Sequence, residues 1–177
     1  MDATELWDLI ETARDEAEDA TDADAVADAL VRDLAERDPE VIEAFDAALA
    51  ALVAESYLTE LWAAAYLVNG GASDDGFDYF RGWLIAQGRD VFEAAVADPD
   101  SLADVPAVRG AIAAGEELEC EAMLGVAWDA YEVATGEELP DAGKVALPEL
   151  AAMWDFDDEE QVREHLPRLA ALSYDQA

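Results

Sequence analysis

The chain has 177 residues, of which 53% are hydrophobic, and 44 acidic against nine basic side chains give a formal net charge of −35. This length and apolar content predict one folded domain, residues 1–177, and exclude a disordered acidic tail. No run of about 18 apolar residues exists, so we expect no membrane partner. The start, MDATELWDLI, carries acids where a signal peptide is basic, so a cytoplasmic protein is expected.

The excess of acid has two interpretations. Self-repulsion should destabilise the compact state in dilute buffer, and molar salt screens it by shortening the Debye length to roughly 3 Å. An acidic surface with a single lysine, Lys144, therefore favours adaptation to concentrated salt. The alternative is an inhibitor that imitates nucleic acid, but its acids would have to line one face, whereas here they are spread along the chain. The absence of a basic patch argues against DNA or RNA as a partner.

Helical periodicity dominates the amino-terminal half of the chain. Asp2 and Glu5 have the spacing of a capping box, and Asp38 followed by Pro39 is typical of a helix start. Behind each start, apolar residues recur at every third or fourth position. Residues 59–68 are apolar nearly all round, which predicts a helix that neighbours cover on every side.

A second buried helix is predicted over residues 74–87. Ser73 is placed to cap its N-terminus. A rotation of about 100° per residue brings Phe77, Phe80 and Leu84 together on one face, which we expect to lie in the core.

Two other positions on this helix have expected packing roles. Arg81 follows Asp78 by three residues, the spacing at which an ion pair forms on a helix surface. Gly82 destabilises a helix interior by about 1 kcal/mol relative to alanine. We therefore expect a neighbouring helix to pass close to Gly82.

The pattern weakens toward the carboxyl terminus. We expect a short helix over residues 90–97, loop and short turns over 101–115, and a long helix over 116–135 that ends at Gly136. The tail is predicted to hold a short turn in LPELAAMWDF and then a helix that Pro167 breaks or restarts.

No segment alternates in the way that a strand does, so the fold class is predicted to be all-α. The expected architecture is a single compact domain of about seven or eight helices. Its centre would be a buried helix pair, residues 59–68 and 74–87.

The predicted binding site lies along the edge of the 74–87 helix and the turn before it. A glycine-rich turn that enters a helix can hold an anion, but Asp74 and Asp75 would repel a phosphate there. We therefore expect a segment of a partner protein or a small molecule, and no cofactor. The candidate residues are Trp62, Asn69, Ser73, Asp74, Asp75, Asp78, Arg81, Trp83 and Gln87.

Catalysis is the weaker alternative. Three carboxylates, Asp74, Asp75 and Asp78, could hold a divalent cation together with Glu119 or Glu121, which would suit a metal-assisted hydrolase. Such spacing arises often by chance in a chain this acidic, so no metal ligand is assigned. The sequence contains no Walker motif, no G-x-S-x-G and no H-E-x-x-H, and no catalytic residue is predicted.

The lone cysteine and the lone histidine are interpreted as ordinary residues. Glu119 and Glu121 flank Cys120, and negative neighbours raise a thiol pKa and disfavour the reactive thiolate. His165 lies near a helix break in an acidic tail, which is typical of a surface histidine.

The run LWAAAYLVNGGASDDGFDYFRGWLIAQGRDVFEAAVADPDSLADV resembles the core of an uncharacterised family, the domain of unknown function numbered 4240. The segments ELWDLIETAR and GEELP are also similar to that family, so the likeness covers most of the chain. The resemblance implies an all-helical domain of this size. It implies no established activity, and no catalytic residue is carried over from it.

Overall fold

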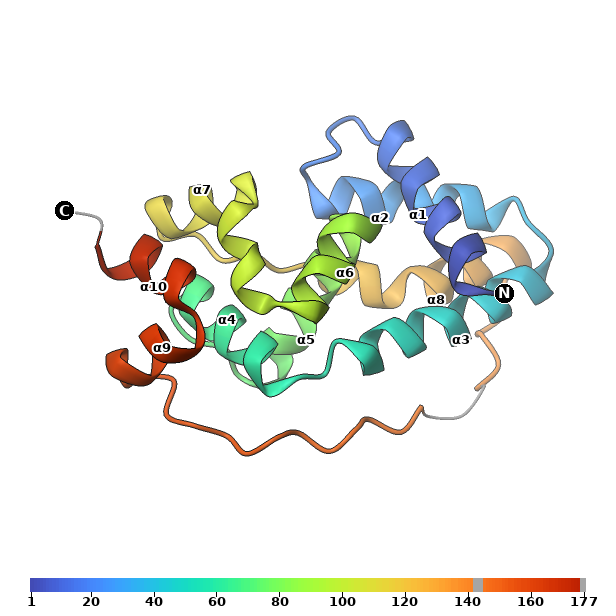
Figure 1. Ribbon diagram of the computed structural model, residues 1–177. Coiled ribbons are helices and arrows are strands. Elements are labelled where there is room, and N and C mark those ends of the chain that lie inside the picture. Colours follow the sequence, from blue (N-terminus) through green and yellow to red (C-terminus); the bar gives the residue numbers. More distant parts are fainter. Residues whose placement is uncertain (142–144, 176–177) are drawn as a thin grey trace.

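The computed structural model describes residues 1–141 and 145–175, and within these ranges every regular element is a helix (Figure 1). The all-α prediction is confirmed, but the described residues form ten α-helices and one 3-10 helix, more than expected. None of these helices is both long and apolar enough to cross a bilayer. In chain order they are α1 (Ala3–Glu16), α2 (Ala23–Ala35), α3 (Pro39–Glu55), α4 (Thr59–Asn69), α5 (Asp74–Ala86), α6 (Arg89–Ala97), η1 (Pro99–Asp104), α7 (Pro106–Ala114), α8 (Glu121–Thr135), α9 (Glu159–His165) and α10 (Pro167–Tyr174).

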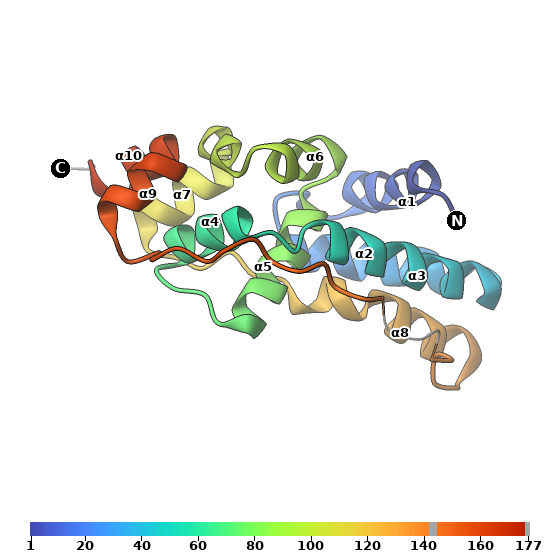
Figure 2. The same cartoon turned by 60° about the horizontal axis from the view of Figure 1, so that its bottom comes forward.

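Helix α5 lies between two groups of helices (Figures 1 and 2). On one side α1, α2, α3 and α8 pack together, and on the other α4, α6, η1, α7, α9 and α10 do so. One buried hydrophobic cluster extends through both groups, from Leu6 to Leu169. The expected central pair is therefore replaced by a central α5, which packs mainly on α8, while α4 packs mainly on α10, α7 and η1.

Local capping chemistry explains most of the helix boundaries. The Asp2 carboxylate accepts from the N–H groups of Thr4 and Glu5, and the Glu5 carboxylate accepts from Asp2 N at 2.8 Å, which completes the predicted capping box. Gly70 ends α4 in the left-handed region, at φ 69°, where residues other than glycine are strained. Ser73 Oγ accepts from Gly76 N at 3.1 Å and caps α5 as expected.

Two predicted segments differ from the structure. Residues 101–115 were expected to be loop and short turns, but they contain most of η1 and all of α7. Pro106 explains the second helix, because proline suits the first helical position. In the tail, residues 145–155 carry no regular structure, and the turn expected in LPELAAMWDF comes only at its end, at Phe156.

The long helix predicted over 116–135 begins five residues late, at Glu121. Tertiary hydrogen bonds hold the preceding residues out of the helix. The Asn69 side chain accepts from Leu118 N at 3.0 Å and donates to Leu118 O at 3.3 Å. Cys120 N donates to the Tyr79 carbonyl of α5 at 2.9 Å, so this N–H is not available to a helix of residues 116–120.

The interior of α5 is packed as its sequence predicts. Phe77, Phe80 and Leu84 are fully buried. Gly82 faces the main chain of Cys120, and a Cβ placed at Gly82 would overlap the Cys120 carbonyl oxygen and lie 3.3 Å from its carbon. The expected close approach is confirmed, and its partner is the residue that precedes α8.

The buried thiol of Cys120 faces α2. Its Sγ lies 3.2 Å from Asp24 Oδ1. Burial, together with the hydrogen bond and charge of Asp24, raises the pKa of the Cys120 thiol to about 12. The predicted direction is confirmed, but the cause is burial and Asp24 rather than the flanking residues Glu119 and Glu121.

Replacing Gly82 by alanine should destabilise the fold by at least about 2 kcal/mol, because the new methyl group meets main chain that cannot rotate away. The control is Gly125→Ala, a position inside α8 where a Cβ meets no atom within 4 Å. This change should raise stability by about 0.5–1 kcal/mol, since alanine has the higher helix propensity. Urea unfolding in 3 M KCl measures both free energies, and equal effects of the two substitutions would contradict the close approach.

The stability of the protein should fall with rising pH in the alkaline range because of Cys120. Its folded pKa, about 12, lies above the unfolded value of about 8.5. The fold therefore favours the neutral thiol over the thiolate. The resulting contribution to the free energy of unfolding is complete below pH 8.5 and is lost as the pH rises toward 12. The free energies of unfolding of the wild type and Cys120→Ala should converge by up to about 1.4 kcal/mol per pH unit above pH 9. A difference that stays constant from pH 7 to 10.5 would show that the thiol ionises freely.

Candidate functional site

The nine residues predicted to form a site come from α4, from the turn that follows it and from α5. Three of them organise the main chain. Asn69 clamps the main chain of Leu118, and Ser73 caps α5. Trp62 donates from Nε1 to the Ala72 carbonyl at 3.1 Å and stacks on Phe77 at 4.8 Å between ring centroids. These side chains hold the turn against α5.

The acidic members of the set remain at the surface. Asp74 and Asp75 are exposed in the first turn of α5, where the helix dipole favours negative charge. Tyr79 donates to Glu121 Oε1 at 3.2 Å, and the charge of Glu121 raises the pKa of this tyrosine. Across residues 1–141 and 145–175, no three His, Cys, Asp or Glu side chains form a group that could hold a metal ion. The convergence that a metal-assisted hydrolase requires is therefore not present in the described part of the chain.

Arg81 lies inside the protein rather than at the edge of α5. Only 1% of it is exposed, and it is the largest fully buried side chain. Its guanidinium donates to the Asp78 carboxylate and to the Val53 carbonyl, and it lies 4.8 Å from the Phe77 ring centroid and 5.1 Å from that of Tyr57. The predicted ion pair with Asp78 is present, and it neutralises a charge within the core.

The remaining two members also lie close to main chain or core. Trp83 is buried beside Phe80, and Gln87 donates to the Trp83 carbonyl at 3.4 Å. Asn69 lines a surface pocket of about 260 Å³ together with Ile112 and Ser173. Binding at the edge of α5 therefore stays a prediction, and most of the side chains named for it already have partners within the chain.

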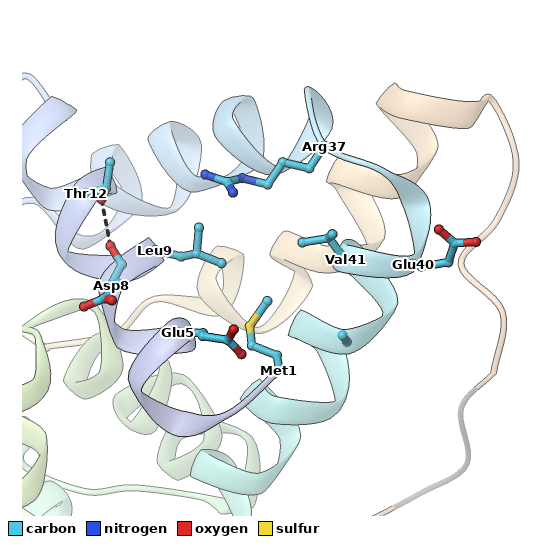
Figure 3. Close-up of a pocket in the computed structure, with 9 residues that line it drawn as sticks. Met1, Glu5, Asp8, Leu9, Thr12, Arg37, Glu40 and Val41 are labelled. Carbon is cyan, nitrogen blue, oxygen red and sulfur yellow. Dashed lines mark hydrogen bonds between the residues drawn. The ribbon is translucent and has the colours of Figure 1, made fainter.

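A larger open pocket lies between α1 and α3, where the sequence indicated no site. Its volume is about 580 Å³ (Figure 3). Leu9 and Val41 face each other across its middle, and Met1 lies beside them. We name this hollow the α1–α3 pocket, and its lining residues are Met1, Glu5, Asp8, Leu9, Thr12, Arg37, Glu40, Val41 and Ala44.

Charged groups of both signs surround the apolar middle of the α1–α3 pocket. Arg37 extends toward α1 along one side, and the Glu5 carboxylate lies next to Met1 on the other, while Glu40 points away (Figure 3). Asp33 orients Arg37 by accepting from Nε at 3.0 Å and from Nη2 at 2.8 Å. The sequence did not indicate this pocket, because the apolar and polar residues of α1 have the spacing of an ordinary amphipathic helix.

His165, the lone histidine of the sequence, contacts two side chains in the fold. His165 Nδ1 lies 3.1 Å from Glu60 Oε1, and its ring stacks on Trp154 at 4.5 Å between centroids. The Trp154 indole donates to the same Glu60 oxygen at 3.3 Å. Because 105 residues separate His165 from Glu60, no local pattern could have indicated this cluster.

Comparison with known proteins identifies the family. Neither the curated proteins nor the solved structures that were compared gave a match. The sequence model of one family, described as a protein of unknown function (DUF4240), matches residues 1–133. This span contains α1 to α7, nearly all of α8, and every residue of the predicted site and of the α1–α3 pocket. The chain therefore belongs to the DUF4240 family, as the resemblance of its central run indicated.

Proposed function

We propose that this protein is a helical binding module whose ligand site is the α1–α3 pocket. The observation that supports the proposal is an open hollow of about 580 Å³ with an apolar middle and charged ends. Pockets for small molecules typically have volumes of about 300–1,000 Å³, mostly apolar walls and a few convergent polar groups. The binding module expected from the sequence is thus retained, with its site moved from the edge of α5 to α1 and α3.

The lining of the pocket suggests the chemistry of its ligand. The apolar side chains of Leu9 and Val41 would contact a hydrocarbon stretch. Arg37, held in place by Asp33, would pair with a carboxylate at one end of the ligand. The Glu5 carboxylate, next to Met1, would pair with an ammonium group at the other end. A small amphoteric molecule with an apolar middle meets these requirements.

A ligand of this class can be tested with 6-aminohexanoate, which places five methylene groups between a carboxylate and an ammonium group. We expect saturable binding with a Kd on the order of 1 mM, the affinity of a good ligand of this size. Val41→Trp should abolish binding by filling the pocket. Val133→Trp is the matched control, because Val133 is 70% exposed and lies on α8, which contributes no residue to the lining of the pocket.

Titration calorimetry in 1 M KCl can measure these affinities, with hexanoate and hexylamine as half-ligands. Both half-ligands should bind more weakly than 6-aminohexanoate, since each meets only one charged end of the pocket. The absence of saturable heat with wild-type protein, or equal loss in Val41→Trp and Val133→Trp, would refute the proposed site.

We also propose that the acidic surface adapts the protein to molar salt. Acidic residues lie on nine of the eleven helical segments of the described chain, all except α7 and α10, so the net charge of −35 is not gathered on one element. Repulsion among these charges weakens as the Debye length falls from about 10 Å at 0.1 M to about 3 Å at 1 M ionic strength. The imitation of nucleic acid remains the alternative, and it requires a regular row of carboxylates on one face.

The melting temperature should rise by roughly 10 °C between 0.1 M and 3 M KCl, because several kcal/mol of repulsion are screened. Circular dichroism at 222 nm can follow the transition. A variant with the exposed acids Asp15, Glu18 and Asp28 changed to lysine should show a smaller rise, since it carries less repulsion to screen. A melting temperature independent of KCl would contradict salt adaptation.

A further inference from the structure

A segment without regular structure crosses one face of the protein between α8 and α9. We name residues 145–157 the strap. It runs beneath α3 and α4 in Figure 1, and in Figure 2 it passes in front of them. In the described part of the chain, no hydrogen bond joins the main chain of the strap to the main chain of another element. Its hold on the helices therefore depends on side chains.

Three side-chain hydrogen bonds tie the strap to α4. Thr59 Oγ1 donates to the Ala151 carbonyl at 2.9 Å. The Trp154 indole donates to Glu60 Oε1 at 3.3 Å, and Tyr66 Oη donates to Asp157 Oδ1 at 2.9 Å. These three bonds involve residues 151, 154 and 157, and among the described residues no hydrogen bond joins residues 145–150 to a helix.

The strap fills the surface beneath it incompletely. Val145, Leu147 and Met153 are each about half exposed, whereas Trp154 and Phe156 are partly buried against the core. Two hollows of about 330 Å³ each remain along its path. The first lies between the strap and the α3 and α8 residues Leu49, Ala50, Val53 and Leu124. The second lies between the strap and Tyr57, Leu58, Glu60, Val96 and Pro99.

We name this surface the strap groove and define it by Leu49, Ala50, Val53, Leu58, Val96 and Pro99. Its apolar lining and its two hollows suit an extended chain whose alternate side chains enter hollows. All six residues lie within the span that the family model matches, residues 1–133, whereas the whole strap lies outside it. The groove thus belongs to the part of the chain that the family model covers, whereas the strap that lies over it is outside that part.

The charges around the strap groove favour a different occupant. The strap carries Glu149, Asp155 and Asp157, and it lies on a surface that already carries Asp46 and Glu60. Like charges brought together in this way repel each other. Glu60 Oε2 is buried and has no hydrogen-bond partner, so a donor at this point would satisfy an oxygen that the strap leaves unpaired.

We propose that the strap groove docks an extended segment of a partner protein with apolar and basic side chains, and that the strap is a displaceable occupant that blocks the groove in cis. The apolar side chains of the partner fill the two hollows, and its basic side chains pair with Asp46 and Glu60. Release of the strap requires the loss of its three bonds to α4 and of the packing of Trp154 on His165 and of Phe156 on Tyr66. This surface is separate from the α1–α3 pocket, so the two proposals stand or fall independently.

A labelled peptide tests the proposal on the full-length chain. The probe is a fluorescein-labelled peptide with the sequence of residues 145–157 and the substitutions Glu149→Arg, Asp155→Arg and Asp157→Arg. Its affinity is measured by fluorescence anisotropy in 1 M KCl, which limits non-specific attraction to the acidic protein. A control peptide with the same residues in scrambled order measures the non-specific binding that remains at this salt concentration.

The protein variants separate displacement from simple binding. The double variant Trp154→Ala, Asp157→Ala loosens the strap and leaves the groove unchanged, and it should bind the probe at least tenfold more tightly than wild type. Adding Ala50→Trp to the double variant blocks the groove and should abolish binding, with an unchanged circular dichroism spectrum and melting transition showing that it folds.

Three results with the probe overturn the proposal. They are equal probe affinity for wild type and the loosened variant, equal affinity for the probe and the scrambled peptide, and retained binding in the blocked variant. Light scattering is measured on the loosened variant without peptide. A dimer that forms there and disappears in the blocked variant would identify a second copy as the occupant, and it would also overturn the proposal of a basic partner.

Discussion

The close approach of α5 to the residues before α8 is the constraint on which the rest of the architecture depends. Gly82 lets the Cys120 carbonyl lie directly on α5, and Cys120 N closes the contact by donating to the Tyr79 carbonyl. Asn69 fixes the same segment from the end of α4 through Leu118. A side chain at position 82 would separate α5 from α8 and thereby the two groups of helices that α5 joins. The late start of α8 is a consequence of this contact.

A buried cation stabilises the junction from the other side. The guanidinium of Arg81 donates to the Val53 carbonyl in the last turn of α3, where the helix dipole favours positive charge. Asp78 balances its charge, and the rings of Tyr57 and Phe77 contribute cation–π attraction. One arginine thus links α5 to α3 through groups that water would otherwise solvate. Removing Asp78 would leave the charge of Arg81 buried and unpaired, so Arg81 and Asp78 act as one structural unit.

Local chemistry in the sequence predicted the features that depend on near neighbours. The capping box of α1, the Ser73 cap of α5 and the aromatic face of α5 depend on residues within about two turns, and all three are present. The burial of Arg81, the extended run before α8 and the partners of His165 depend on residues distant in sequence, which periodicity cannot reveal. The α1–α3 pocket was missed for the same reason, because its two walls meet only in the folded chain.

Helix α3 contributes to both proposed surfaces. Its core face, with Ile42, Phe45 and Leu49, lies between two flanks. Val41 and Ala44 line the α1–α3 pocket on one flank, and Ala50 and Val53 line the strap groove on the other. Coupling between the surfaces would require α3 to have two discrete positions. Fully buried Phe45 and the Arg81 bond to Val53 oppose such a shift. The two proposed surfaces therefore lie on opposite flanks of a helix that the core holds in place.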